Sequence, residues 1–238
     1  MNNFEENKLS LRKCEEIANI KNNPVVSASI TIIKSLFPFG GELVDGVVEK
    51  TLTKNINEKR EKLLDIILSD TEMITTDMCS DVEFLISYEK IVEAVDRLLT
   101  NDKIVYFGNL FKNGYLNKDR IQAYKFEEYF DIINSLSYRQ LDLLALLHKY
   151  STKEVLCEDE KKVDGERWSL FKKDACERFS ISEDDLIAIL KSTEKSGLCK
   201  EVVGAIYGYR GGTFEATSLL KDFVSFVTSR SSAAESNI

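Results

Sequence analysis

The chain has 238 residues, a hydrophobic content of 43% and a formal net charge of −8, which together are typical of a soluble globular protein with one large core or two smaller ones. Only two prolines, with many leucine, isoleucine, lysine and glutamate residues, predict a mainly α-helical fold, because little interrupts the helical hydrogen-bond ladder. The acidic balance repels phosphate backbones, so a general affinity for nucleic acid is disfavoured.

The five cysteines are widely spaced, and none forms the Cys-x-x-Cys pair that would indicate a zinc site or redox chemistry. We therefore predict reduced thiols that serve as small apolar side chains. The chain opens without the basic segment and following apolar segment of a secretory signal. Both features favour a cytoplasmic protein.

The first predicted helix, over Asn2 to Ile20, is a polar amphipathic arm. An apolar stretch follows over residues 25–48, and a Pro-Phe-Gly-Gly break divides it into two helices. Neither half offers the roughly 20 uninterrupted apolar residues of a membrane span, so we predict a buried hairpin. A membrane-active hairpin, packed away until a trigger releases it, stays open as an alternative because glycine permits refolding. Its residues would be Ile30, Ile33, Phe37, Pro38, Phe39, Gly40 and Gly41.

Further segments with apolar residues at helical spacing predict that residues 1–134 form a helical bundle that includes the hairpin. These helices are placed at 57–68, 81–99, 103–112 and 118–134. The third of them should end at Asn113-Gly114, where glycine can adopt the left-handed cap conformation. Aromatic residues in the last helix are interleaved with acidic residues instead of arginines, so we interpret them as core and not as a base-stacking platform. They are Tyr124, Phe126, Tyr129 and Phe130.

Residues 135–230 are predicted to form a second domain, followed by a flexible tail over 231–238. The first helix of this second domain starts with a capping box at Ser137 and Gln140. The elements expected after that helix are an exposed connection over 151–166, a helix over 168–179, a helix capped by Ser182 and ended by Gly197, strands over 198–206 and 213–216, and a helix over 218–228.

This order of elements resembles a winged helix, most clearly over Leu186 to Phe226, in the runs Glu194-Lys195-Ser196-Gly197-Leu198 and Gly211-Gly212-Thr213-Phe214-Glu215-Ala216-Thr217. The predicted fold class is therefore mainly α, a helical bundle with a C-terminal winged-helix-like module. With its Pro-Phe-Gly-Gly hairpin, the whole chain resembles a loosely defined set of uncharacterised bacterial proteins that are often encoded near phage-defence or mobile-element genes. That resemblance implies an accessory or regulatory role in phage defence or in a mobile element.

A winged helix that reads DNA presents the N-terminal half of its third helix to the duplex. Acidic side chains occupy those positions here, and the basic residues lie at the far end of the helix and on the wing. Because phosphate contacts dominate affinity for DNA, we favour a module that binds a protein partner. The predicted partner-binding residues are Glu183, Asp184, Asp185, Lys191, Lys195 and Arg210. A DNA-binding transcriptional regulator is the alternative, and a membrane-perturbing effector that uses residues 25–48 is the second alternative.

No catalytic motif is found in the sequence. The single histidine, His148, lies in a leucine-rich helix without a nucleophile elbow, and its expected place is the helix surface or a C-terminal cap. Walker A, Rossmann, HExxH and EF-hand patterns do not occur. We therefore predict a non-enzymatic protein without catalytic, cofactor-binding or metal-binding residues.

Overall fold

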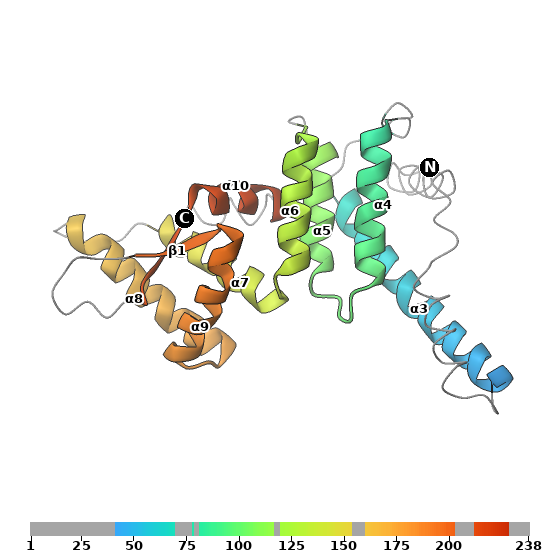
Figure 1. The fold of residues 1–238 in the computed structure, drawn as a ribbon, viewed down its shortest axis with the longest axis horizontal. Helices are drawn as coiled ribbons and strands as arrows, with labels where there is room; N and C mark the ends of the chain where they lie inside the picture. Colours follow the sequence, from blue (N-terminus) through green and yellow to red (C-terminus); the bar gives the residue numbers. More distant parts are fainter. Residues whose placement is uncertain are drawn as a thin grey trace. The chain divides into compact units, whose positions relative to one another are not determined.

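The computed structural model describes residues 41–69, 78, 81–116, 120–153, 160–202 and 212–228, and for residues 41–50 and 160–164 it describes the backbone alone (Figure 1). The described residues are mainly helical, with a two-stranded antiparallel sheet near the C-terminus. This confirms the prediction of a mainly α-helical fold.

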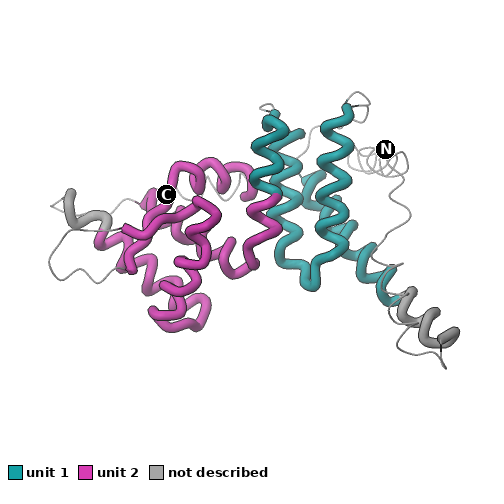
Figure 2. The backbone as a smooth tube through the Cα atoms, in the orientation of Figure 1, with its two compact units in different colours: residues 1–130 teal, residues 131–238 magenta. Residues whose placement is uncertain are grey.

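The chain divides into two compact units, unit 1 over residues 1–130 and unit 2 over residues 131–238, which Figure 2 colours separately. The division falls within a single helix, α6 (Ala123–Ser135). The boundary that the sequence suggests, between residues 134 and 135, lies at the end of the same helix. Each unit has its own cluster of packed aromatic rings.

Unit 1 contains α3 (Gly41–Leu68), α4 (Val82–Asp96), α5 (Ile104–Phe111) and the first part of α6. No proline interrupts α3, which runs as one helix through both segments expected after the glycine pair. Asp81 caps α4, because its Oδ1 accepts hydrogen bonds from the backbone N–H groups of Glu83 at 2.9 Å and Phe84 at 3.4 Å. Helix α3 packs against both α4 and α5.

The close approach of α3 and α5 depends on Gly108. A Cβ atom at this position would lie 2.6 Å from Cγ2 of Ile66, on α3. Glycine therefore leaves the space into which the isoleucine side chain fits.

The prediction that Gly114 caps α5 in the left-handed conformation is wrong. Helix α5 ends at Phe111 and continues into a π-helical turn over Lys112–Leu116, and the described glycines with positive φ are Gly197 and Gly212. Position 114 requires glycine for space, because a Cβ there would lie 2.8 Å from Cγ2 of Ile121. The carbonyl of Gly114 also accepts the backbone N–H of Ile121 at 2.8 Å. Helix α6 begins at Ala123 and not at residue 118.

An aromatic cluster fills the core of unit 1. The ring of Tyr115 lies 5.4 Å from that of Phe111 and 5.4 Å from that of Phe126, measured between centroids, and its hydroxyl shares a buried hydrogen bond with Ser87 at 2.7 Å. Core packing is confirmed for Phe126, which is 1% exposed, but it is wrong for Tyr124, which is 70% exposed. Two residues along a helix correspond to about 200°, so these two side chains point to opposite sides.

Unit 2 contains, after the end of α6, the elements α7 (Tyr138–Ser151), α8 (Glu160–Phe179), α9 (Glu183–Thr193), β1 (Cys199–Glu201), β2 (Phe214–Ala216) and α10 (Ser218–Val227). The capping box predicted for α7 is confirmed. The N–H of Gln140 donates to Ser137 Oγ at 3.3 Å, and the N–H of Ser137 donates to Gln140 Oε1 at 2.8 Å. Ser182 caps α9 in the predicted way, accepting the N–H of Asp185 at 3.1 Å.

The two strands form a short antiparallel ladder in which Cys199 pairs with Ala216. Before β1, a 3₁₀ turn over Glu194–Ser196 ends at Gly197, whose φ of 74° is left-handed, as predicted. After β2, Thr217 Oγ1 caps α10 and donates to the carbonyl of Leu198 at 2.9 Å. The described strands cover residues 199–201 and 214–216, which is less than the ranges predicted from the sequence.

The predicted connection over residues 151–166 is wrong in its second half, because α8 begins at Glu160. Lysine and glutamate are good helix formers, so a charged run can extend a helix as readily as it can form a loop. Of the predicted apolar face, Phe171 and Ala175 are completely buried, whereas Trp168 and Phe179 are half-buried.

Several predictions fall outside the described residues: the arm Asn2–Ile20, hairpin residues 25–40, including Ile30, Ile33, Phe37, Pro38, Phe39 and Gly40, the wing residue Arg210, the tail 231–238, and Cys14, Cys79 and Cys157. Gly41 is the first residue of α3. Within the described ranges, no helix has both the length and the apolar character needed to cross a bilayer.

Candidate protein-interaction site

Helix α9 carries most of the residues predicted to contact a partner. Leu186, Leu190 and Thr193 are buried and fix one side of the helix in unit 2. Side chains three and four positions apart share a face of a helix. The exposed face therefore contains Asp184, Ala188 and Lys191, and it continues into the 3₁₀ turn at Lys195.

The first turn of α9 is strongly acidic, since Glu183, Asp184 and Asp185 are all exposed there. Asp185 takes part in the cap, because its Oδ2 accepts a hydrogen bond from Ser182 Oγ at 2.7 Å. Glu183 accepts a hydrogen bond from Lys172 at 2.7 Å. Within the described part of the chain, Asp184 forms no ion pair and no side-chain hydrogen bond. Carboxylates in this position stabilise the helix through its dipole and repel other anions.

Basic side chains around α9 and the strands β1 and β2 are largely balanced by carboxylates. Three ion pairs achieve this: Lys172 with Glu183 at 2.7 Å, Lys191 with Glu201 at 3.6 Å, and Lys200 with Glu215 at 2.7 Å. Lys195 forms no ion pair within the residues that the structure describes. A phosphate group that approached this surface would have to compete with the neighbouring carboxylates for the three paired lysines.

The predicted place of His148 is only partly right. It lies in the last turn of α7, but its side chain is half-buried, and its Nδ1 is buried without a hydrogen-bond partner among the described residues. Burial, together with the positive charge of Lys221, lowers the pKa of His148. At neutral pH the imidazole is therefore uncharged.

Among the described residues, no group of three or more His, Cys, Asp or Glu side chains lies close enough together to hold a metal ion. Cys176 and Cys199 are free thiols. Burial raises the pKa of both. An activated nucleophile needs the opposite shift.

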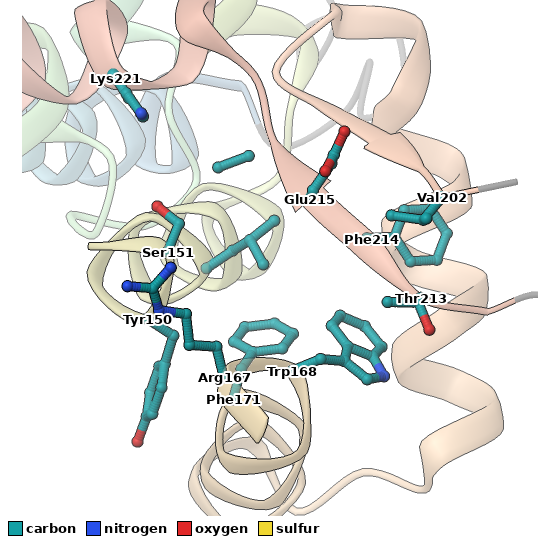
Figure 3. A pocket seen from close by; sticks show the side chains of 12 residues that line it. Tyr150, Ser151, Arg167, Trp168, Phe171, Val202, Thr213, Phe214, Glu215 and Lys221 are labelled. Atoms are coloured by element: carbon teal, nitrogen blue, oxygen red, sulfur yellow. The ribbon is translucent and has the colours of Figure 1, made fainter. Parts of the chain in front are cut away.

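A pocket in unit 2 was missed by the sequence analysis. It has a volume of about 200 Å³ and lies among α7, α8, the strands β1 and β2, and α10 (Figure 3). Its lining consists of Leu147, Tyr150, Ser151, Arg167, Trp168, Phe171, Val202, Thr213, Phe214, Glu215, Ala216 and Lys221. The one usable sequence signal is the adjacent pair Arg167 and Trp168, because the only tryptophan of the chain follows an arginine in an otherwise polar part of α8.

Comparisons of the chain with models of protein families, with curated proteins and with solved structures gave no match.

Proposed function

We propose that this chain is a non-enzymatic bacterial protein of the cytoplasm that acts by binding another protein through the exposed face of α9. The order of three helices, two antiparallel strands and a further helix in unit 2 supports a winged-helix-like module. The resemblance described for the sequence supports an accessory or regulatory role in phage defence or in a mobile element.

The observation that carries the proposal is the charge of the α9 surface. Asp184 is exposed at the helix N-terminus without a partner cation in the described residues. Three lysines near α9 are paired with carboxylates: Lys172, Lys191 and Lys200. Affinity for DNA depends on unpaired cations that contact phosphates. A protein partner with basic side chains complements this surface better than DNA does, because opposite charges across an interface favour both encounter and register.

Charge reversal on α9 tests the proposal. The full chain and its Asp184→Lys variant are used as baits in extracts of the cells that naturally express the protein. Glu128→Lys is the matched control, since Glu128 is an exposed carboxylate on α6, in unit 1. We expect a protein that the unchanged chain and Glu128→Lys both retain and that Asp184→Lys loses. Equal retention by all three baits would remove α9 from the interaction.

The DNA-binding alternative is tested with a fluorescently labelled duplex by anisotropy. A protein that makes 6–10 phosphate contacts loses a factor of about 10³–10⁵ in affinity between 50 and 200 mM salt. We expect no saturable binding of the duplex at the lower salt concentration. Saturable binding with that steep salt dependence, weakened by Lys195→Gln, would favour a DNA-binding regulator over our proposal.

A further inference from the structure

The exposed face of α9 changes the sign of its charge along the helix. Asp184 lies in the first turn, Ala188 in the middle, Lys191 in the last turn, and Lys195 in the 3₁₀ turn that continues the helix. All four residues, which we call the α9 stripe, are exposed. Steps of four, three and four residues keep their side chains within one narrow band, because an α-helix turns once every 3.6 residues. The stripe is acidic at one end, neutral in the middle and basic at the other end.

Both flanks of the α9 stripe are covered by other parts of unit 2. On one side, Ser192 Oγ accepts a hydrogen bond from Nε2 of Gln140, on α7, at 2.8 Å. On the other side, Ile187 lies against Gly212, where a Cβ atom would be 3.0 Å from the isoleucine Cδ1. Among the described residues, the part of α9 that stays open to a second molecule is therefore the stripe itself.

Asp184 is the carboxylate of the first turn that has no partner among the described residues. Its two neighbours are engaged, because Glu183 pairs with Lys172 at 2.7 Å and Asp185 accepts a hydrogen bond from Ser182 at 2.7 Å. A cation that a second molecule brings to the acidic end would thus meet no competing cation at Asp184.

The two lysines at the basic end can also bind a second molecule. Lys195 forms no ion pair with a described residue. Lys191 is paired with Glu201, but the distance of 3.6 Å is longer than the roughly 2.7–2.9 Å of a charge-assisted hydrogen bond. The side chain of Lys191 is 53% exposed, and an ammonium group has three N–H donors. It can therefore serve a further carboxylate while it stays near Glu201.

Such a stripe is complementary to itself when two copies meet in antiparallel orientation. A two-fold axis at Ala188 exchanges the two ends, so that each copy presents its acid to the bases of the other. Asp184 lies about 6 Å before Ala188 along the helix, and Lys191 and Lys195 lie about 4.5 Å and about 10.5 Å after it. Asp184 is therefore level with the space between the two lysines of the second copy. A parallel pair would instead place like charges opposite each other.

We propose that two copies of this chain associate through antiparallel α9 helices, with Asp184 of each copy between Lys191 and Lys195 of the other. This inference rests on the function proposed above, since it names a second copy as the partner of the same α9 face. Ala188 suits the crossing point, because the distance between two packed helices depends on the side chains at their contact. The stripe is only about 16 Å long, so the interface is small and the dimer is weak and reversible.

Sedimentation velocity of the full chain measures the association, with protein concentrations from about 10 µM to about 1 mM. We expect an equilibrium between monomer and dimer with a Kd of about 0.1 mM at low ionic strength. The Kd should rise about tenfold when salt is added to about 0.5 M, because salt screens ion pairs between exposed side chains.

Charge reversal separates the α9 stripe from general electrostatics. Asp184→Lys should weaken the dimer about tenfold or more, because the two-fold axis places like charges at both ends of the interface at once. The same variant makes the chain less acidic than its net charge of −8, which lowers the general repulsion between copies. A loss of association therefore points to the stripe. Glu128→Lys, at an exposed carboxylate on α6, changes the net charge equally and should not weaken the dimer.

A rescue experiment tests the antiparallel arrangement. Lys191→Glu combined with Lys195→Glu should weaken the dimer as Asp184→Lys does. All three changes together reverse every charge of the stripe and keep it complementary to itself, so this triple variant should recover a Kd within about threefold of that of the unchanged chain. If the triple variant stays monomeric while its far-UV circular dichroism matches that of the unchanged chain, the proposal is overturned.

Two other results would overturn the self-association. One is a chain that remains monomeric over the whole concentration range at low salt. In that case the function proposed above still stands if the extract experiment retains a different protein that Asp184→Lys loses. The other is a dimer that Asp184→Lys and Glu128→Lys affect equally, because a surface other than α9 would then join the two copies.

Discussion

The buried carboxylate of Asp96 offers the sharpest stability test in unit 1. It forms two hydrogen bonds with Arg60, from Nε to Oδ1 at 3.0 Å and from Nη2 to Oδ2 at 2.7 Å. The neighbouring Lys59 is 4% exposed and donates from Nζ to the carbonyl of Leu98. Burial lowers the pKa of Lys59, and the negative charge of Asp96 opposes that shift. One carboxylate thus compensates two cations between α3 and the end of α4.

Asp96→Asn removes this charge with almost no change in volume. Loss of one partner from a buried ion pair costs about 3–5 kcal/mol, because the other charge remains buried without compensation. Here the carboxylate is 3% exposed but Arg60 is 18% exposed, and the asparagine oxygen still accepts a hydrogen bond. We therefore expect the free energy of unfolding to fall by about 2–3 kcal/mol, which is at or just below the lower limit of that range.

Urea unfolding followed by far-UV circular dichroism measures the effect. With a urea dependence of about 2 kcal/mol/M, the midpoint should fall by about 1 M. Glu83→Gln is the control in the same unit, because Glu83 pairs with Arg120 at 2.9 Å while its side chain is 57% exposed. Such surface pairs contribute about 1 kcal/mol at most. If the two variants shift the midpoint equally, the buried network does not stabilise unit 1 as argued.

Two further predictions concern glycine packing and the histidine. Gly108→Ala should destabilise unit 1 by about 1 kcal/mol or more in a urea titration, because the added Cβ meets Ile66 and overpacking outweighs the gain in helix propensity. Gly165→Ala should instead stabilise α8 by about 0.8–1 kcal/mol, because nothing lies within 4 Å of the Cβ position there. If both alanine variants change the stability in the same direction, this packing account is refuted. In the folded chain the pKa of His148 is lowered from 6.5. Between pH 6.5 and this lower pKa, the imidazole therefore binds more protons in the unfolded chain than in the folded one. The stability of unit 2 should thus fall as the pH is lowered through 6.5 toward the folded pKa. An NMR titration of the single imidazole should show the low pKa, and Lys221→Gln should raise it; a midpoint at or above the usual value would contradict the burial argument.

The candidate sites differ in how far the sequence could predict them. The acidic first turn of α9 follows directly from Ser182 and the three carboxylates after it, because a helix start and its charge are local properties. The ion pair between Lys191 and Glu201 joins residues on different elements, so no spacing rule could have predicted it. The pocket is still less accessible to sequence reasoning, since Arg167 and Lys221 are brought to the end of α7 by the packing of two other helices.

The sequence by itself determined where α7 and α9 begin, at the caps formed by Ser137 and Ser182. Caps and helical periodicity act over three or four residues, so the information needed is contained in each segment. Tertiary structure alone decided why Gly108 and Gly114 must be glycine, because the atoms that exclude a Cβ come from other parts of the chain. It likewise decided that Tyr124 is exposed, since helical spacing leaves the direction of the core undefined until neighbouring helices pack.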